Sequence, residues 1–208
     1  MEFIDLGLIS FFEALEQQDR TVSKISNCDQ KETVYLLEHP HVFTIGRVRN
    51  PENLLAQDDW EGHPINPIST NRGGDITYHG PGQLVGYPHL DLRNRGRDVH
   101  RYLRNLEETL IRTAFAFGMV AFRRPSLTGV WTEQGKLASI GVGVRHWVTM
   151  HGFALNVQTD LRYFELINPC GFDNCQMVSL SSLSGQKIAL SVVKRVFKQN
   201  FIDVFEGN

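Results

Sequence analysis

Residues 128–157, TGVWTEQGKLASIGVGVRHWVTMHGFALNV, decide the fold class of this chain. Three strand-like stretches lie within them, each rich in valine, isoleucine and other apolar residues: 128–132, 137–144 and 148–157. Gly135 and Lys136 are expected in a hairpin turn between the first two stretches. Strands that follow one another in a run, without a helix after each, are typical of an α+β protein.

Capping residues and breakers predict elements on the N-terminal side. Ser10, followed three residues later by Glu13, forms a capping-box pattern, which predicts a helix over about 11–24. Two short buried strands are expected further along, separated by the breaker Pro40: 34–38 and 42–46.

Two more helices are expected from apolar periodicity. Asp98 can cap a helix that stops naturally at Gly118, and its apolar face is Val99, Tyr102, Leu103, Leu106, Leu110 and Ile111. The last helix is expected over about 187–205, with an apolar stripe of Ile188, Val192, Val193, Val196, Phe197 and Phe201.

Length and composition favour one globular domain over residues 1–208. Hydrophobic residues make up 41% and charged residues 21% of the chain. Folding at this size buries roughly 70% of the surface of the unfolded chain, so no disulfide or metal is needed to stabilise the fold. Lysine and arginine number 21 against 23 acidic residues, which argues against a general nucleic-acid binder. The apolar runs fall far short of the ~18 residues that a membrane span requires.

Cysteine use and the N-terminal sequence predict a cytoplasmic protein. Cys28, Cys170 and Cys175 cannot all pair with one another, and no zinc-ligand spacing occurs among them. A reducing compartment fits this pattern. The first twenty residues lack the basic and apolar regions of a signal peptide, and they carry acids that transit peptides avoid.

The most unusual segment is glycine-rich and reads RGGDITYHGPGQLVGY over residues 72–87. Its glycines allow close backbone approach to a ligand or a positive φ, and Pro81 stiffens the turn. The spacing is not that of a dinucleotide-binding fingerprint. A ligand loop carrying Arg72 and His79 is one interpretation, and a plain glycine-rich hairpin is the other.

Cys170 and Lys136 are the residues best suited to covalent chemistry. Cys170 lies between Pro169 and Gly171 on a constrained turn, where its sulfur could face a cleft. A nearby cation would favour the nucleophilic thiolate. Lys136 begins an apolar strand, and a lysine removed from water gives up its proton more readily. An inert cysteine and a solvated lysine are the alternative interpretations.

The pattern R-G-G-x-x-T-Y-H-G-P-G-Q over residues 72–83 resembles the signature of the octanoyltransferases of lipoate synthesis. Further blocks match in the same order, and they are Leu37–Pro40, Val42–Arg47, Thr128–Trp131 with Gly135–Gly141, His151–Val157 and Pro169–Gly171. The resemblance covers roughly residues 30–185, which is most of the chain.

This resemblance implies a fold similar to the catalytic domain of lipoate- and biotin-protein ligases, a mixed β-sheet flanked by helices around an acyl pocket. It implies Cys170 as nucleophile and Lys136 as its proton partner. Small residues such as Ala138, Gly141 and Gly152 would leave room for an eight-carbon chain. The substrate-binding residues would be Arg72, Gly73, Gly74, Asp75, Ile76, Thr77, Tyr78, His79, Ser139, Ile140, Gly141, His151, Gly152, Phe153 and Ala154.

The implied reaction is the first step of endogenous protein lipoylation. Octanoyl would move from acyl carrier protein, through a cysteine thioester, to a lysine of a lipoyl domain. The acceptors would be the lipoyl domains of 2-oxoacid dehydrogenase E2 subunits and the glycine cleavage H protein. The enzyme would be a monomer that needs no cofactor or metal and binds neither nucleic acid nor membrane. Two residues depart from the family pattern: Asp75, expected to be a harmless solvated acid, and Phe153, which could narrow the pocket.

Four other functions compete with this interpretation. An ATP-dependent lipoate-protein ligase would use Lys136 for a phosphate and leave Cys170 without a role. A non-catalytic acyl- or biotin-binding domain would need neither residue for chemistry. A cysteine thioesterase would use water in place of the amine. A zinc protein would draw on His39, His41, His79 or His151, whose positions lack ligand spacing.

Overall fold

A computed structural model describes residues 1–48, 50–55, 59–60, 63–169 and 175–207. Its main sheet has seven strands, and β1 pairs in parallel with β2 while the other neighbours are antiparallel. In spatial order the strands are β1 (Glu2–Leu8), β2 (Thr33–Glu38), β8 (Gln83–His89), β12 (Val148–Asn156), β11 (Gly135–Arg145), β10 (Leu127–Thr132) and β9 (Phe122–Arg124).

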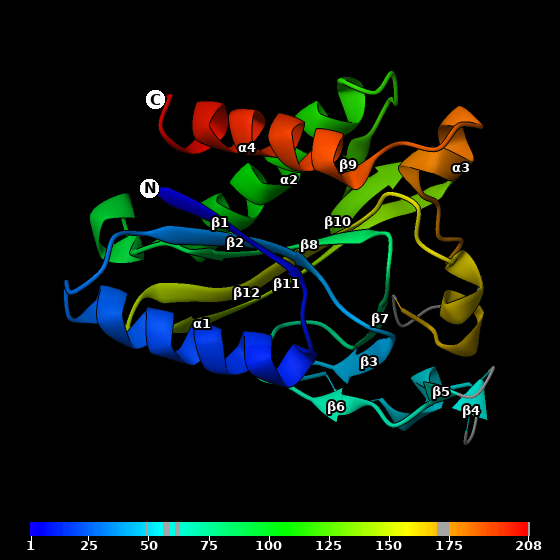
Figure 1. Cartoon of the computed structure of the whole chain (residues 1–208), viewed down its shortest axis with the longest axis horizontal. Helices are drawn as coiled ribbons and strands as arrows, with labels where there is room; N and C mark the ends of the chain where they lie inside the picture. Colours follow the sequence, from blue (N-terminus) through cyan, green and yellow to red (C-terminus); the bar gives the residue numbers. More distant parts are fainter. Residues whose placement is uncertain (49, 56–58, 61–62, 170–174, 208) are drawn as a thin grey trace.

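A smaller sheet lies beside one end of the main sheet (Figure 1). It consists of β6 (Ile68–Ser69), β3 (Val42–Ile45) and β7 (Ile76–His79). The remaining short elements are β4 (Asp59–Trp60), β5 (His63–Pro64), η1 (Pro51–Asn53), η2 (Leu92–Arg95) and η3 (Leu161–Leu166). The predicted strands 34–38 and 42–46 are therefore confirmed, and they belong to different sheets.

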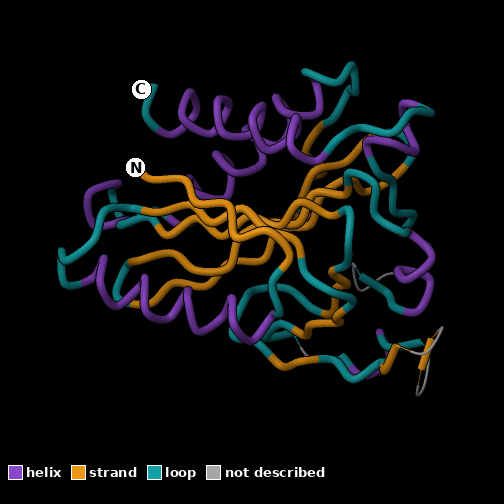
Figure 2. Tube along the Cα trace, in the orientation of Figure 1, coloured by secondary structure: helices purple, strands orange, loops and turns teal. Residues whose placement is uncertain are grey.

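Helices cover both faces of the main sheet, as Figures 1 and 2 show. Helix α1 (Phe11–Ser26) covers one face, where Ala14 packs with Tyr35 and Val22 packs with Met150. Helices α2 (Val99–Phe115) and α4 (Leu190–Phe205) cover the other face. The short helix α3 (Leu180–Ser184) lies near the start of α4. A mixed sheet flanked by helices confirms the α+β prediction.

The main core lies between the sheet and the pair α2 and α4. Buried side chains of the sheet, such as Leu84 and Leu155, pack there with Leu106 and Leu110 of α2. Phe197 and Phe201 of α4 complete this layer and lie 5.5 Å apart between ring centroids. Burial of apolar surface on this scale is the main force that holds the helices to the sheet.

The predicted helix caps are present. The N–H of Glu13 donates to Oγ of Ser10 at 3.3 Å, and the Ser10 N–H donates to the Glu13 carboxylate at 3.2 Å. The N–H of Arg101 donates to Asp98 at 2.9 Å. Gly118 follows α2 with a φ of 79°, a conformation that favours glycine.

Two predicted boundaries are wrong. The hairpin turn is Glu133–Gln134, and Lys136 already lies in β11, because it pairs with Trp131 of β10. The last helix begins at Leu190 instead of residue 187. Ile188 stays outside it because its N–H donates to Ser181 and its carbonyl accepts from Gln158.

Candidate active site

The site forms where β11 runs beyond its neighbour β10. Those two strands pair from Thr132↔Gly135 to Val130↔Ala138, whereas β11 continues to Arg145 alongside β12. The glycine-rich loop lies against the open edge, where the Gly73 N–H donates to Val142 O at 2.8 Å. A cavity of about 460 Å³ lies at this edge.

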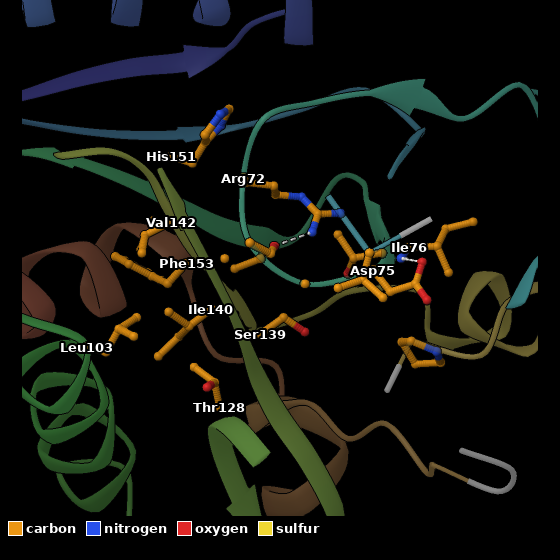
Figure 3. Close-up of a pocket in the computed structure, with 18 of the residues that line it drawn as sticks. Arg72, Asp75, Ile76, Leu103, Thr128, Ser139, Ile140, Val142, His151 and Phe153 are labelled. Atoms are coloured by element: carbon orange, nitrogen blue, oxygen red, sulfur yellow. Dashed lines mark hydrogen bonds between the residues drawn. The ribbon is translucent and has the colours of Figure 1, made fainter. Parts of the chain in front are cut away.

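The cavity has two sides because side chains alternate along β11. Figure 3 shows an apolar group on one side of the β11 ribbon, formed by Leu103, Ile140, Val142 and Phe153. The glycine-rich loop lies on the other side and contributes Arg72, Asp75 and Ile76. One cavity therefore offers both an apolar wall and a polar wall to a ligand.

All but one of the predicted substrate-binding residues line this cavity, and so does Lys136. They are Arg72, Gly73, Gly74, Asp75, Ile76, Thr77, His79, Ser139, Ile140, Gly141, His151, Gly152, Phe153 and Ala154. Segments far apart in the sequence thus meet at one cavity.

Tyr78 is the exception, since it does not line the cavity. Its neighbours Thr77 and His79 do, and alternation along β7 turns the Tyr78 ring to the opposite side. There it stacks on Tyr163 with ring centroids 4.7 Å apart, and its hydroxyl lies 2.8 Å from Nδ1 of His41. Burial raises the pKa of this phenol. Tyr78 therefore packs in the core beside the cavity, and its predicted role in substrate binding stays a prediction.

The space beside the glycines of the site is filled by neighbouring protein atoms. This corrects the expectation that Gly141 and Gly152 leave room for an acyl chain. A Cβ on Gly141 would lie 2.8 Å from Gly73 O and 3.2 Å from Cδ of Arg72. A Cβ on Gly152 would collide with the backbone oxygen of Gly86. The glycine-rich loop and β8 occupy that space, so the absent side chains serve close packing of the cavity walls.

The two departures from the family pattern have structural roles. Asp75 is not simply solvated, because its carboxylate accepts from the Ile76 N–H at 2.9 Å and from the Asn53 amide at 2.5 Å. Phe153 lines the cavity while its ring packs on Phe197, with centroids 4.6 Å apart. Gly86 lies so close to that ring that a Cβ there would collide with it.

Arg72 places a buried positive charge in the polar wall. Its guanidinium donates to Thr44 O at 2.7 Å, to Oγ1 of Thr44 at 3.0 Å and to Gly73 O at 3.0 Å. These acceptors are neutral oxygens that orient the guanidinium, and the Asp75 carboxylate in the same wall offsets part of its charge. Burial lowers the pKa of Arg72 to about 10, which leaves it charged at neutral pH.

His79 is a neutral hydrogen-bonding group at this wall. Burial and, to a smaller extent, the nearby His39 lower its pKa to about 3. Its Nδ1 lies 2.8 Å from Oε1 of Gln83, whose amide nitrogen donates to Asn156 at 2.9 Å. Because the carbonyl end of Gln83 faces the ring, Nδ1 carries the proton and Nε2 is an acceptor.

Two more histidines lie nearby and are also neutral. His39 lies 2.8 Å from the Tyr87 hydroxyl through Nε2, and burial lowers its pKa to about 4. His151 lies against Asn71, and burial lowers its pKa to about 3. Among the described residues, no three His, Cys, Asp or Glu side chains come together as a metal site.

Lys136 is buried in the cavity wall, with 6% of its surface exposed. Its Nζ lies 5.4 Å from the centre of the Trp131 ring. Its carbonyl accepts from the Val178 N–H at 3.0 Å, which ties this strand to the chain after residue 175. The interpretation of Lys136 as an ordinary solvated lysine is therefore wrong.

Cys170 lies outside the described residues, so its predicted meeting with Lys136 stays a prediction. Pro169, the residue before it, lines the same cavity as Lys136. Cys28 is exposed, and Cys175 is half-buried beside the cluster that contains Phe43.

Several residues that build the site were not predicted from the sequence. Phe11, Arg47, Tyr87 and Trp131 also line the cavity. Glu107, a fully buried acid on α2, contacts the backbone of Gly129 beside it. An acid among the apolar positions of a predicted helix was the signal that could have found Glu107.

The sequence from 10 to 202 matches the family model of the lipoyl protein ligase A/B catalytic domain. An octanoyltransferase of Geobacter metallireducens is 53% identical over 92% of this chain and 87% of its own length. An octanoyltransferase of Syntrophotalea carbinolica is 55% identical over 93% of this chain and 89% of its own length.

Solved structures show the same fold at much lower identity. Lipoate-protein ligase A bound with ATP superposes with a TM-score of 0.76 at 15% identity, over 99% of this chain and 85% of that one. Biotin protein ligase from Aquifex aeolicus superposes with a TM-score of 0.56 at 8% identity, over 100% of this chain and 70% of that one.

The fold, the cavity and these matches place the chain in the family of lipoyl protein ligase A/B catalytic domains. Within that family it is an acyltransferase of the octanoyltransferase group, as the sequence blocks predicted. Among the described residues, no helix has both the length and the apolar character needed to cross a membrane.

Proposed function

We propose that this chain, as one domain, transfers octanoyl from acyl carrier protein to a lysine of a lipoyl domain, with Cys170 as the covalent carrier. The observation that carries the proposal is the burial of Lys136 in a cavity that Pro169 also lines. Relatives about half identical to the chain are octanoyltransferases, which favours octanoyl as the acyl group.

The first step exchanges one thioester for another. Lys136 in its neutral form accepts the proton of the Cys170 thiol, and the sulfur attacks the donor carbonyl. The bond between that carbonyl and the donor sulfur breaks, and the leaving thiolate takes the proton back from Lys136. Because a thioester replaces a thioester, the step is nearly isoenergetic and needs no ATP.

The second step forms the amide. The amine of the acceptor lysine attacks the octanoyl carbonyl on Cys170 and passes a proton to Lys136. The carbon–sulfur bond breaks, and the Cys170 thiolate recovers that proton. A thiolate both attacks and leaves easily, which suits a carrier used twice in one cycle.

The remaining cavity residues bind and orient the substrate. The apolar group with Ile140 and Phe153 excludes water, which limits hydrolysis of the intermediate. Arg72 offers a positive charge, and Nε2 of His79 offers an acceptor. A pKa of about 3 makes His79 a poor proton acceptor at neutral pH, so its role in this scheme is binding.

The proposal extends to partners and location. The donor is octanoyl-acyl carrier protein, and the acceptors are lipoyl domains of 2-oxoacid dehydrogenase E2 subunits and the glycine cleavage H protein. The enzyme acts as a cytoplasmic monomer. The odd number of cysteines supports a reducing location.

An ATP-dependent lipoate-protein ligase is the second candidate, since a ligase bound with ATP shares this fold. That enzyme would catalyse exchange between ATP and pyrophosphate and would tolerate loss of Cys170. We expect no such exchange here.

Intact mass after incubation with octanoyl-acyl carrier protein tests the proposal. An octanoyl group adds about 126 Da, and we expect it on Cys170. Cys170→Ala should abolish both the adduct and transfer, whereas Cys28→Ala and Cys175→Ala should retain both. An adduct on Cys175, or full activity of Cys170→Ala, would overturn the site assignment.

Lys136→Arg separates charge from proton transfer. Arginine keeps a positive charge but does not give up its proton at neutral pH, because the pKa of its guanidinium is above about 12. We expect an adduct to form slowly and amide formation to stop. Transfer at the wild-type rate would exclude proton exchange by residue 136.

A further inference from the structure

Glu107 is a buried carboxylate that the proposed chemistry does not use. It lies on α2 and has no exposed surface. Its Oε2 accepts from Arg104 at 2.7 Å and from Arg123 at 3.1 Å. Its Oε1 accepts from the Gly129 N–H at 3.2 Å. A buried carboxylate is costly unless it is paired, and here two arginines and a backbone N–H supply the partners.

Gly129 joins this carboxylate to the lysine. Its φ is 134°, which favours glycine. A Cβ added there would lie 2.9 Å from Cε of Lys136 and 3.7 Å from Nζ. It would also lie 2.7 Å from Ala138 O. The end of the lysine side chain therefore rests directly on the backbone that Glu107 holds.

The same segment forms part of the cavity wall. Thr128, the residue before Gly129, lines the cavity, as does Trp131. The Trp131 ring lies 4.4 Å from the Arg124 guanidinium and 5.4 Å from Nζ of Lys136. A shift of the Gly129 peptide would change both the surface under Lys136 and the wall next to it.

We propose that Glu107 is a positioning residue, which holds the Gly129 peptide so that the Lys136 amine points into the cavity. It exchanges no proton and touches no substrate. The inference rests on the proposed role of Lys136, and it adds that an acid on α2 controls that role through one glycine.

Three variants dissect the contact. Glu107→Gln keeps an acceptor for the Gly129 N–H and loses the charge that the two arginines share. Glu107→Leu loses both functions at similar volume. Gly129→Ala leaves Glu107 intact and presses directly on Cε of Lys136. Glu108→Gln is the matched control, since Glu108 also pairs with Arg123, at 2.7 Å, from the adjacent position on α2.

The assay measures kcat and KM for octanoyl-acyl carrier protein, with thermal unfolding as a check on folding. We expect Gly129→Ala and Glu107→Leu to lower kcat about tenfold or more with KM changed less than about threefold. Glu107→Gln should retain most of the rate, and Glu108→Gln should match the wild type. Wild-type kcat in a folded Glu107→Leu enzyme would overturn the inference, whatever the result for Gly129→Ala.

A double-mutant cycle separates positioning from a merely structural effect. If Gly129→Ala acts through Lys136, it should slow adduct formation in the wild-type background and cost nothing more in a Lys136→Ala background. Equal losses in both backgrounds would show a structural role instead. Should Glu107→Leu fail to fold, Glu107→Ala replaces it in the same assay, because Gly129→Ala leaves Glu107 intact and does not test the acid itself.

The same experiment keeps the inference apart from the proposed function. An active Lys136→Ala enzyme would refute the role of the lysine itself. An inactive Lys136→Ala enzyme, together with fully active Gly129→Ala and Glu107→Leu enzymes, would refute only the positioning by Glu107.

Discussion

The guanidinium of Arg72 donates to both the carbonyl and the hydroxyl oxygen of Thr44, at 2.7 and 3.0 Å. Thr44 lies on β3 of the small sheet, whereas Arg72 begins the loop that packs on β11 of the main sheet. This pair therefore joins the two sheets at the cavity wall.

Arg72→Lys should weaken the site even though the charge is kept. One ammonium cannot make the paired contacts of the planar guanidinium, so the loop loses its tie to Thr44. We expect kcat/KM for octanoyl-acyl carrier protein to fall roughly tenfold. Arg20→Lys, at an exposed arginine paired with Glu16, is the control and should have no effect. An unchanged kcat/KM in Arg72→Lys would contradict this account.

His79→Ala should impair substrate binding without blocking acyl-enzyme formation. The pKa of about 3 leaves His79 neutral and weakly basic, so its contribution is the acceptor at Nε2. We expect a higher KM and an octanoyl adduct that still forms at saturating donor, measured by intact mass. A folded His79→Ala protein that never forms the adduct would make His79 the catalytic base in place of Lys136.

Gly141→Ala should destabilise the protein. Its Cβ would lie 2.8 Å from Gly73 O and 3.2 Å from Arg72, both fixed by hydrogen bonds. Overpacking of this kind costs about 1–3 kcal/mol of unfolding free energy, measurable by urea titration. Gly73→Ala is the matched comparison, because its Cβ would meet only Val142 O, at 3.5 Å. Equal stability of the two variants would contradict the packing argument.

The protein should lose stability as the pH falls below about 6.5. Burial lowers the pKa of His39 and His89 to about 4, and of His79 and His151 to about 3. Between these values and 6.5, the unfolded chain binds protons that the folded chain excludes. Acid therefore favours unfolding. The stability that these neutral histidines contribute is fully present above the pKa of a histidine in the unfolded chain, and it is lost as the pH falls below that value.

Urea unfolding at pH 7.5 and pH 5.5 measures the effect. Each buried imidazole should account for about 1.3 kcal/mol of the loss over this interval, or about 5 kcal/mol for four. His89→Gln should make the loss of unfolding free energy between the two pH values smaller by about 1.3 kcal/mol. His146→Gln, at the exposed hairpin tip, should leave that loss unchanged. A free energy of unfolding that is equal at both pH values would refute the linkage.

Elements with strong local signals were predictable from the sequence. The cap of α1 depends on Ser10 and Glu13, which lie one turn apart, and the cap of α2 depends on Asp98 and the backbone of Arg101. Such contacts are made within one turn, so the residue pattern contains all the information needed. The strand β1 had no comparable signal, since its pairing with β2 depends on a partner beyond α1.

The sequence by itself determined the α+β class, the family and many of the residues around the cavity. This information lies in the ordered sequence blocks, because each block contains residue types that the site needs. The sequence did not separate Tyr78, which lies outside the cavity lining, from Thr77 and His79, because a block lists neighbours along the chain, whereas alternation in β7 sends alternate side chains to opposite faces.

Tertiary structure alone decided what surrounds each of those residues. The neutral state of His79 depends on burial and on Gln83, and the space beside Gly141 is filled by Arg72 from a distant segment. Likewise, Glu107 reaches Gly129 only because α2 packs beside the start of β10. Burial, hydrogen-bond partners and free volume arise from contacts between distant segments, so a linear pattern does not contain them.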